Sequence, residues 1–228
     1  MSDPAPCLVI FCKRPALFHG KQRLAETIGA EQAHTFARLL LDCALEDARA
    51  WDGPLVLSPA SADDSQWATD LLEREHLVLA QPDGCLGHRL RTIDQELRRR
   101  GQEQVIFIGT DAPMLTPAHY KEARQELSIH DVVLSPASDG GVTIMGTAKG
   151  WPDMTGLPWS TDRLGAALDN LCRQQGQRVH HITASYDIDV AADLQKLGRD
   201  LADDARPARQ ALHREIGEFL GQKEAKYG

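Results

Sequence analysis

Short apolar runs alternate along the chain with longer segments in which apolar residues recur every three or four positions. The short runs predict strands, and the longer segments predict amphipathic helices. Strands are expected at residues 7–12, 54–57, 77–79, 104–108, 131–134, 142–145 and 178–182. Helices are expected at residues 30–48, 65–73, 89–100, 117–126, 161–173, 194–204 and 207–220. This alternation is typical of an α/β fold built around a mainly parallel sheet.

One pair of strands breaks the alternation, because residues 131–134 and 142–145 are joined only by a turn-rich segment. A short connection of this kind predicts antiparallel pairing, and therefore a mixed sheet. The connection contains Asp139-Gly140-Gly141, which has two interpretations. It is either a hairpin turn or a carboxylate beside backbone that a ligand can approach closely.

The ends of two helices carry further signals. Ser160-Thr161-Asp162 combines an N-cap residue with a first-turn carboxylate, which predicts a helix start at that point. In the last segment one helical face carries Leu212, Ile216, Phe219 and Leu220. That face is expected to pack either back on the domain or on a second subunit of a homodimer.

Composition and charge narrow the class of protein. A chain of 228 residues is expected to form a single domain. Its net charge of −8 argues against a nucleic-acid partner but leaves room for a nucleotide. The 5 cysteines are odd in number and show no Cys-x-x-Cys spacing, which indicates reduced thiols in a cytoplasmic protein. Neither a signal peptide nor a membrane-spanning run is evident, so we expect a soluble protein without a membrane partner.

Asp111 stands where an apolar strand ends, in Val105-Ile106-Phe107-Ile108-Gly109-Thr110-Asp111. Ligands of open α/β sheets bind outside the carboxyl ends of the strands, so this carboxylate is placed to meet a metal and a phosphorylated substrate. The alternative is that Asp111 caps the helix that follows Pro113.

Basic residues follow the first strand, with Lys13 and Arg14 at its end and Lys21 and Arg23 just after Gly20, before a helical stretch. Such a loop can surround phosphates with charge and main-chain donors. It matches neither the P-loop nor the dinucleotide-binding pattern, and a solvated basic loop is the other interpretation.

Two carboxylates, Asp187 and Asp189, follow the strand predicted at residues 178–182. Strand alternation sends both to the same side, where they can bind one cation together with Asp111. Alternatively, one of them caps a helix that begins near residue 191. The histidines form no metal-binding pattern, since neighbouring His180 and His181 face opposite ways on a strand. No residue pattern indicates a covalent nucleophile.

Taken in order, these segments resemble a bacterial glycosyltransferase-like family, known as radical-SAM/selenodomain-associated transferase 1 and as arsenosugar-biosynthesis glycosyltransferase. That family is similar to the nucleotide-diphospho-sugar transferase superfamily. The segments that carry the resemblance are Phe11-Cys12-Lys13-Arg14-Pro15, Gly20-Lys21-Gln22-Arg23-Leu24, Gly84-Cys85-Leu86-Gly87-His88-Arg89-Leu90, Gly109-Thr110-Asp111-Ala112-Pro113, Ser135-Pro136-Ala137-Ser138-Asp139-Gly140-Gly141, Pro158-Trp159-Ser160-Thr161 and Tyr186-Asp187-Ile188-Asp189.

The resemblance implies a GT-A fold, a Rossmann-like three-layer αβα sandwich with a mixed, mainly parallel sheet. It implies a nucleotide-binding half at residues 1–113, an acceptor half at 114–195 and a helical tail at 196–228. The residues it assigns to nucleotide binding are Lys13, Lys21, Arg23, Gly87 and Asp111. It places Asp111 on a Mg²⁺ or Mn²⁺ ion, with Asp187 or Asp189 completing the metal site, and Asp139 beside the transferred group as a catalytic residue together with Asp111.

This chain departs from the family pattern at a few positions around the expected site. Where the family has Val-Pro-Gly before Lys-Thr-Arg-Leu, this chain has Ala16-Leu17-Phe18-His19-Gly20 and then Gln22. Cys85 replaces an aspartate, and Val142-Thr143 replaces aromatic residues. The function expected from the resemblance is transfer from a nucleotide or nucleotide-sugar donor to a small-molecule acceptor by a glycosyltransferase. The alternatives are a nucleotidylyltransferase, which releases pyrophosphate from a nucleoside triphosphate, and a non-catalytic nucleotide-binding module.

Overall fold

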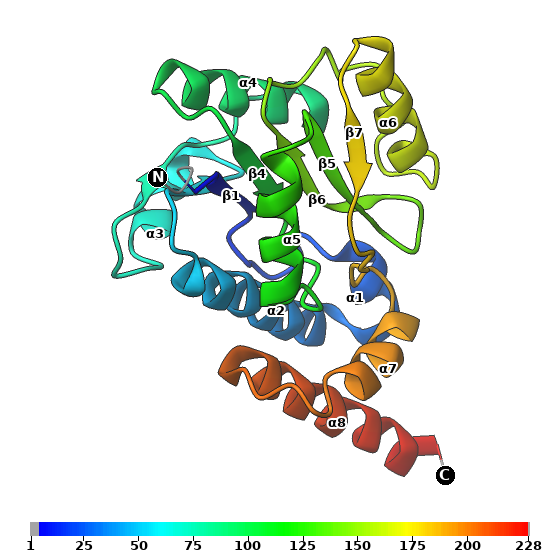
Figure 1. Cartoon of the computed structure of the whole chain (residues 1–228). Coiled ribbons are helices and arrows are strands. Elements are labelled where there is room, and N and C mark those ends of the chain that lie inside the picture. Colours follow the sequence, from blue (N-terminus) through cyan, green and yellow to red (C-terminus); the bar gives the residue numbers. More distant parts are fainter. Residues whose placement is uncertain (1–4, 228) are drawn as a thin grey trace. The chain divides into compact units, whose positions relative to one another are not determined.

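The computed structural model describes residues 5–227, with side chains for residues 5–222. The described chain divides into two compact units, and the first of them, residues 5–14, 47–109 and 115–186, contains the β-sheet (Figure 1). Its strands are β1 Cys7–Cys12, β2 Leu55–Pro59, β3 Leu77–Val78, β4 Val105–Ile108, β5 Val132–Pro136, β6 Val142–Thr147 and β7 Val179–His181.

Among the described residues these strands form one sheet in the order β3-β2-β1-β4-β6-β5-β7. In β1, Val9 is in register with Val56 of β2 on one side and with Phe107 of β4 on the other, and both pairings are parallel. β6 runs antiparallel to β4 and to β5. The mixed, mainly parallel sheet predicted from the sequence is therefore confirmed.

Helices cover both faces of the sheet in this unit. They are the 3-10 helix Ala62–Asp64, α3 Ser65–Thr69, α4 Leu86–Arg99, α5 Pro117–Leu127 and α6 Leu164–Gln174. Leu90 of α4 and Leu168 of α6 share a buried cluster with Met145 of β6. Gly146, the next residue of β6, faces the other way, since a Cβ built there would lie 3.6 Å from the Leu127 side chain of α5. The result is the expected three-layer αβα arrangement.

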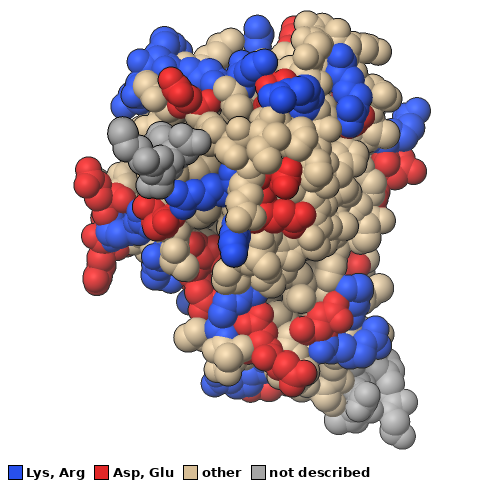
Figure 2. All heavy atoms as spheres, in the orientation of Figure 1, with Lys and Arg blue, Asp and Glu red and all other residues tan. Residues whose placement is uncertain are grey.

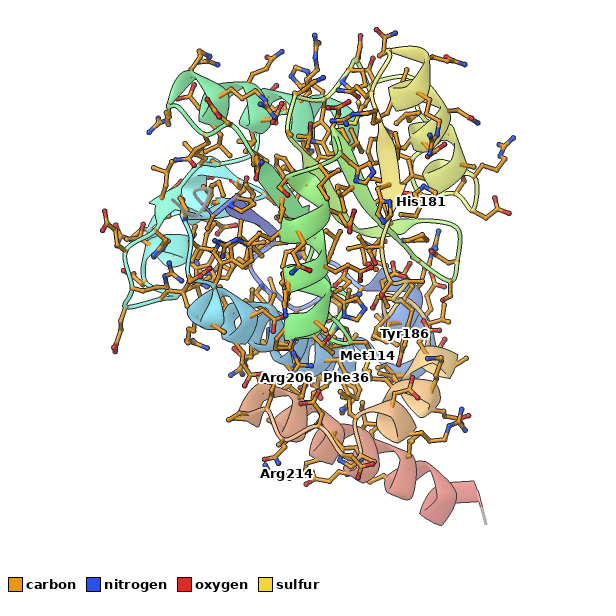
Figure 3. All side chains as sticks on the ribbon, viewed as in Figure 1. Phe36, Met114, His181, Tyr186, Arg206 and Arg214 are labelled. Atoms are coloured by element: carbon orange, nitrogen blue, oxygen red, sulfur yellow. The ribbon has the colours of Figure 1, made fainter. Side chains whose placement is uncertain are left out.

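The second unit, residues 15–46, 110–114 and 187–227, is helical. It contains α1 Gln22–Ile28, all but the last turn of α2 Ala30–Ala50, α7 Ala191–Asp200 and α8 Pro207–Tyr227. Phe36 of α2, labelled in Figure 3, meets Phe219 of α8 edge to face, with ring centroids 5.9 Å apart. Gln32 Nε2 donates to Glu215 Oε1 at 2.6 Å. Of the two alternatives for the C-terminal segment, the one in which it packs back on its own chain is confirmed.

Three helices begin away from the predicted positions, and one of them, α4, begins at Leu86 instead of residue 89. The helix expected from residue 161 begins at Leu164, because Ser160 has a φ of 62° and the Thr161 hydroxyl donates to Pro158 O at 2.7 Å. This local turn takes the place of the first helical turn. The helix expected at 194–204 begins earlier, at Ala191, after the Asp193 carboxylate accepts the main-chain N–H of Val190 at 2.8 Å.

On one face of the molecule, basic side chains are concentrated over a single helix (Figure 2). Figure 2 shows Lys and Arg over α4 at the top of this face, while acidic and basic side chains are interspersed over other elements. Within α4, Arg98 Nε lies 3.1 Å from the buried Asp94, and Arg99 pairs with Glu96. Part of the positive charge of this helix is therefore offset by its own carboxylates.

Within the described part of the chain, no helix is long and apolar enough to cross a membrane.

Candidate functional site

Lys21 stands at the start of α1 in a backbone conformation that is uncommon for a residue with a side chain. Its φ is 48° and ψ is 37°, and Gly20 before it has a φ of 79°. Glycine enters this left-handed region freely, whereas a lysine does so at a cost in free energy. The two residues together turn the chain into α1, and the contacts of the Lys21 side chain hold it in this conformation.

The ammonium group of Lys21 is surrounded by oxygen atoms from two distant segments. Nζ lies 2.9 Å from Asp111 Oδ1 and 3.8 Å from Asp189 Oδ1, and it also donates to the main-chain oxygen of Ile188. The side chain of Lys21 is only 9% exposed, whereas both carboxylates are about half exposed. A cation is thus held at the point where three oxygens converge, and solvent still reaches the carboxylates.

Asp111 lies in the loop that follows β4, in the segment 110–114 of the second unit. Its main-chain oxygen accepts the N–H of Ile188 at 2.9 Å, which ties this loop to the segment that carries Asp189. The alternative that Asp111 caps the next helix is wrong, because α5 begins at Pro117 with Thr116 at the N-cap. The Asp111 side chain therefore faces Lys21 and not a helix end.

Asp189 does not cap α7 either. The N-cap position is Val190, and it is the carboxylate of Asp193 that accepts the N–H groups of Asp189 and Val190, at 2.9 and 2.8 Å. The Asp189 carboxylate instead faces Lys21 and lies 3.6 Å from Arg23 Nη1. The strand alternation expected for Asp187 and Asp189 is wrong, because residues 186–189 belong to no strand.

Three predicted site residues, Lys13, Gly87 and Asp139, belong to the first unit. Lys13 is exposed just after β1. Asp139 lies in the β5–β6 connection, where its Oδ1 accepts the N–H of Gly141 at 2.9 Å. Gly140 has a φ of 87°, and a Cβ there would lie 1.9 Å from Asp162 O. Asp139-Gly140-Gly141 therefore forms a hairpin turn, and the Asp139 side chain is exposed within it.

Gly87 is buried in the first turn of α4, directly against the main chain of another loop. A Cβ at this position would lie 2.4 Å from Met154 O, so close packing alone requires a glycine.

Of the predicted site residues, the structure brings Lys21, Arg23, Asp111 and Asp189 into one cluster. Asp187 neighbours that cluster through Ile188.

Sequence reasoning missed the main-chain oxygen of Ile188, because a carbonyl group carries no signal in the residue type. It also missed Glu126, His130 and His180, whose possible metal-ligand atoms all lie within 4.8 Å of one another. The expectation that the histidines form no metal-type cluster is therefore wrong. The only sequence signal was the four-residue spacing of Glu126 and His130, which places them on the same side of a helical turn.

The cysteines behave as expected for structural thiols. All five are free, and four of them are buried. Burial raises the pKa of the Cys7 thiol to about 12, and burial together with the nearby Asp64 carboxylate raises that of Cys12 to about 12. Burial also raises the pKa of Cys172 to about 12. Protonated, enclosed thiols of this kind are poor nucleophiles, which agrees with the absence of a nucleophile pattern in the sequence.

Comparison with solved structures places the fold in a known class. A crystal structure from Desulfovibrio desulfuricans G20, of a protein provisionally named a nucleotide-diphospho-sugar transferase, matches with a TM-score of 0.87 and 24% identity, over 96% of this chain and 98% of that one. CMP:2-keto-3-deoxy-manno-octonic acid synthetase, solved in complex with CTP, matches with a TM-score of 0.50 and 13% identity, over 85% and 97%. The 4-diphosphocytidyl-2C-methyl-D-erythritol synthase of Anaerococcus prevotii DSM 20548 gives 0.50 and 12%, over 83% and 94%.

The architecture is thus that of the nucleotide-diphospho-sugar transferase class, as the sequence predicted. At these identities the likeness concerns the fold. The chain itself belongs to the family described as uncharacterized protein conserved in bacteria (DUF2064), whose model matches residues 41–161. Comparison with curated proteins gives no match to this sequence.

Proposed function

We propose that this chain is a metal-dependent transferase that uses a nucleotide-activated donor, a sugar nucleotide, and a small-molecule acceptor. The observation that carries the proposal is the convergence of Asp111, Asp189 and the Ile188 oxygen on the ammonium group of Lys21. Such a cluster combines anionic oxygens for a metal ion with a cation for phosphate. Transfer of a group from a nucleoside diphosphate requires a metal ion and a positive side chain to neutralise the charge of the leaving diphosphate.

The donor set suits a hard divalent cation such as Mg²⁺ or Mn²⁺. Carboxylate and carbonyl oxygens are the ligands these ions take, and the Lys21 ammonium acts as a stand-in cation at the point where the oxygens meet. Asp111 and Asp189 would hold the ion, and Asp187 from the same segment would complete the site. When bound, the ion supplies neutralisation of the diphosphate charge and stabilisation of the leaving group.

Once the ion takes the place of the Lys21 ammonium group among these oxygens, Lys21 is available to bind the diphosphate oxygens of the donor together with Arg23. Arg23 is suited to this role because its side chain is 68% exposed and is held only by a 3.6 Å contact with Asp189. Guanidinium and ammonium groups form charge-assisted hydrogen bonds to phosphate that strengthen as negative charge develops on the leaving group. We assign Lys13 and Gly87 to nucleotide binding in the same half of the chain, residues 1–113.

On the acceptor side, residues 114–195, Asp139 is the proposed catalytic residue. One carboxylate oxygen accepts the Gly141 N–H at 2.9 Å, which fixes the orientation of an otherwise exposed side chain. A carboxylate held in this way can position an acceptor hydroxyl group and take up its proton as the new bond forms.

The second candidate function is nucleotidyl transfer, which would use the same basic residues and the same metal ion. It is considered because two similar folds belong to enzymes named for the synthesis of cytidylyl products. In nucleotidyl transfer a phosphorylated acceptor attacks the α-phosphate of a nucleoside triphosphate, and pyrophosphate leaves. The basic residues Lys13, Arg14, Lys21 and Arg23 would suit a triphosphate equally well.

The product distinguishes the two reactions. The purified full chain is incubated with Mn²⁺ and either sugar nucleotides or nucleoside triphosphates, with candidate acceptors present, and the products are separated by chromatography. A nucleoside diphosphate released from a sugar nucleotide supports the proposal, and pyrophosphate released from a triphosphate supports the second function. Binding of a nucleotide without turnover would identify a non-catalytic module. If Asp111→Ala retains both metal-dependent donor binding and turnover, the proposed site is wrong.

A further inference from the structure

Glu126, His130 and His180 form a cluster on the first unit that lies outside the residues proposed for transfer. Glu126 Oε2 is 3.1 Å from His130 Nδ1 and 3.7 Å from His180 Nε2. The two imidazole rings are stacked, with centroids 4.6 Å apart and an angle of 23° between their planes. All three side chains are partly exposed, so an ion from solvent can reach them.

Two elements of the fold bring these residues together. Glu126 lies in the last turn of α5, and the N–H of His130 donates to Glu126 O at 2.8 Å, which continues the helical turn just far enough to bring the two side chains alongside each other. His180 is the middle residue of β7, an edge strand paired in parallel with β5. Alternation along β7 sends the neighbouring His181 to a different partner, Asp169, at 3.1 Å. Strand and helix therefore present two imidazoles to one carboxylate.

We propose that Glu126, His130 and His180 form a binding site for a transition-metal dication of the Zn²⁺ class. Two imidazole nitrogens and one carboxylate oxygen are a donor set that zinc and its neighbours in the periodic table prefer, whereas Mg²⁺ takes oxygen ligands. Two ligands of one tetrahedral zinc ion, each bound at about 2.0–2.1 Å, lie roughly 3.3 Å apart. The two separations that involve Glu126, 3.1 and 3.7 Å, lie on either side of that value, and all three ligand atoms lie within 4.8 Å of one another.

Binding would change the present contacts of His130. His130 Nδ1 also lies 3.2 Å from Glu126 O, so the ring would exchange this contact for the metal ion. Three protein ligands leave one position of a tetrahedral ion open for water or another small ligand. Because its donors are nitrogen-rich, the site differs in chemistry from the all-oxygen cluster of Asp111 and Asp189, and it does not depend on the proposed transferase function.

The test measures metal binding by the full chain, free of any affinity tag. Co²⁺ is the first probe, because its visible absorption reports nitrogen ligation directly, and competition with a chromophoric chelator then gives the Zn²⁺ affinity. The variants are His130→Ala, His180→Ala and Glu126→Gln, and His181→Ala is the matched control on the same strand. Near-ultraviolet circular dichroism confirms that each variant is folded, and Glu126→Gln, which keeps the side-chain size, serves if an alanine variant does not fold.

We expect one equivalent of Co²⁺ or Zn²⁺ to bind the wild type and the His181→Ala control with similar affinity. Each ligand variant should lose affinity by about tenfold or more. Two results would overturn the proposal: no stoichiometric binding of either ion by the wild type, or affinity that His180→Ala and Glu126→Gln leave unchanged. Equal losses in His181→Ala and His180→Ala would also overturn it, because they would indicate nonspecific binding to surface histidines.

Discussion

Arg209 of α8 donates from Nε to the main-chain oxygen of Pro113 at 3.1 Å, and Pro113 lies two residues after Asp111. The same guanidinium donates from Nη1 to Cys43 O and to Glu46 Oε2, and its side chain is fully buried. The C-terminal helix thereby holds the loop that carries Asp111 against α2. The C-terminal helix, expected from the sequence to pack through its apolar face, is thus also part of the support of the candidate site.

Replacing Arg209 with methionine should lower the free energy of unfolding by about 3–5 kcal/mol. The variant removes a buried cation. The Glu46 carboxylate then lacks its ion-pair partner, and the Pro113 oxygen lacks the hydrogen bond from Arg209. Denaturant unfolding of the full chain measures the effect. A double variant, Arg209→Met with Glu46→Gln, should recover part of the loss, because it no longer leaves a carboxylate unpaired. An effect below about 1 kcal/mol, the size expected for an exposed pair, would contradict this account.

Lys21 and Arg23 should differ in their effect on binding of a nucleoside diphosphate. Lys21 is enclosed between Asp111 and Asp189, so Lys21→Met should weaken binding by about 1.5–3 kcal/mol, the range for hydrogen bonds to charged groups. Arg23 is exposed, and Arg23→Met should cost about 0.2–1 kcal/mol. Calorimetric titration with Mn²⁺ present measures both. The reverse order of the two effects would contradict the central place of Lys21 in the proposed site.

Asp131 should make stability depend on pH in the acid range. Its hydrogen bonds to the Arg178 guanidinium and main-chain N–H, with Lys149 at 3.1 Å, hold the pKa of this buried carboxyl well below its usual value. As pH falls, the unfolded chain therefore takes up the proton first, so the stabilisation is fully present above about pH 5 and is lost as pH falls through the folded-state pKa.

The Asp131→Asn variant should accordingly be less stable than the wild type at neutral pH. The difference in unfolding free energy should stay constant down to about pH 5 and narrow below about pH 4. Urea unfolding across this range checks the prediction, with the exposed carboxylate Asp63→Asn as the control. A difference that does not change with pH would show that Asp131 stabilises the fold without its charge.

A glycine at position 87 can be explained by packing or by nucleotide binding, and unfolding experiments without nucleotide test the packing explanation. Because a Cβ would lie 2.4 Å from Met154 O, Gly87→Ala should lower the unfolding free energy by about 1–3 kcal/mol through overpacking. Gly156→Ala is the matched control, since no atom lies within 4 Å of a Cβ built there. Thermal unfolding without nucleotide measures the packing effect alone. Unchanged stability of Gly87→Ala would mean that this loop adapts and that packing does not require the glycine.

The strands were predictable because each is a short apolar run whose ends are marked by turn residues, as in residues 105–108 before Gly109. The antiparallel pairing of β5 and β6 followed from the Asp139-Gly140-Gly141 turn. The start of α6 was not predictable, because the Thr161 hydroxyl group serves a local turn as readily as a helix cap.

For the site, the sequence identified Lys21, Asp111 and Asp189 but not the way they meet. Their meeting depends on the left-handed backbone of Lys21 and on the hydrogen bond between Ile188 and Asp111, which no residue pattern encodes. The cluster of His130 and His180 was hidden for a similar reason, since 50 residues separate two histidines that only the α5–β7 packing brings together.

The most direct test of the central claim is calorimetric titration of the full chain with a panel of nucleoside diphosphates, with and without Mn²⁺. The wild type and the exposed-site control Asp63→Asn should bind at least one of them, and binding should require the metal ion. Asp111→Asn should lose about tenfold or more of that affinity, because a charge-assisted contact of about 1.5–3 kcal/mol disappears. Metal-independent binding, or unchanged affinity in Asp111→Asn, would contradict the account.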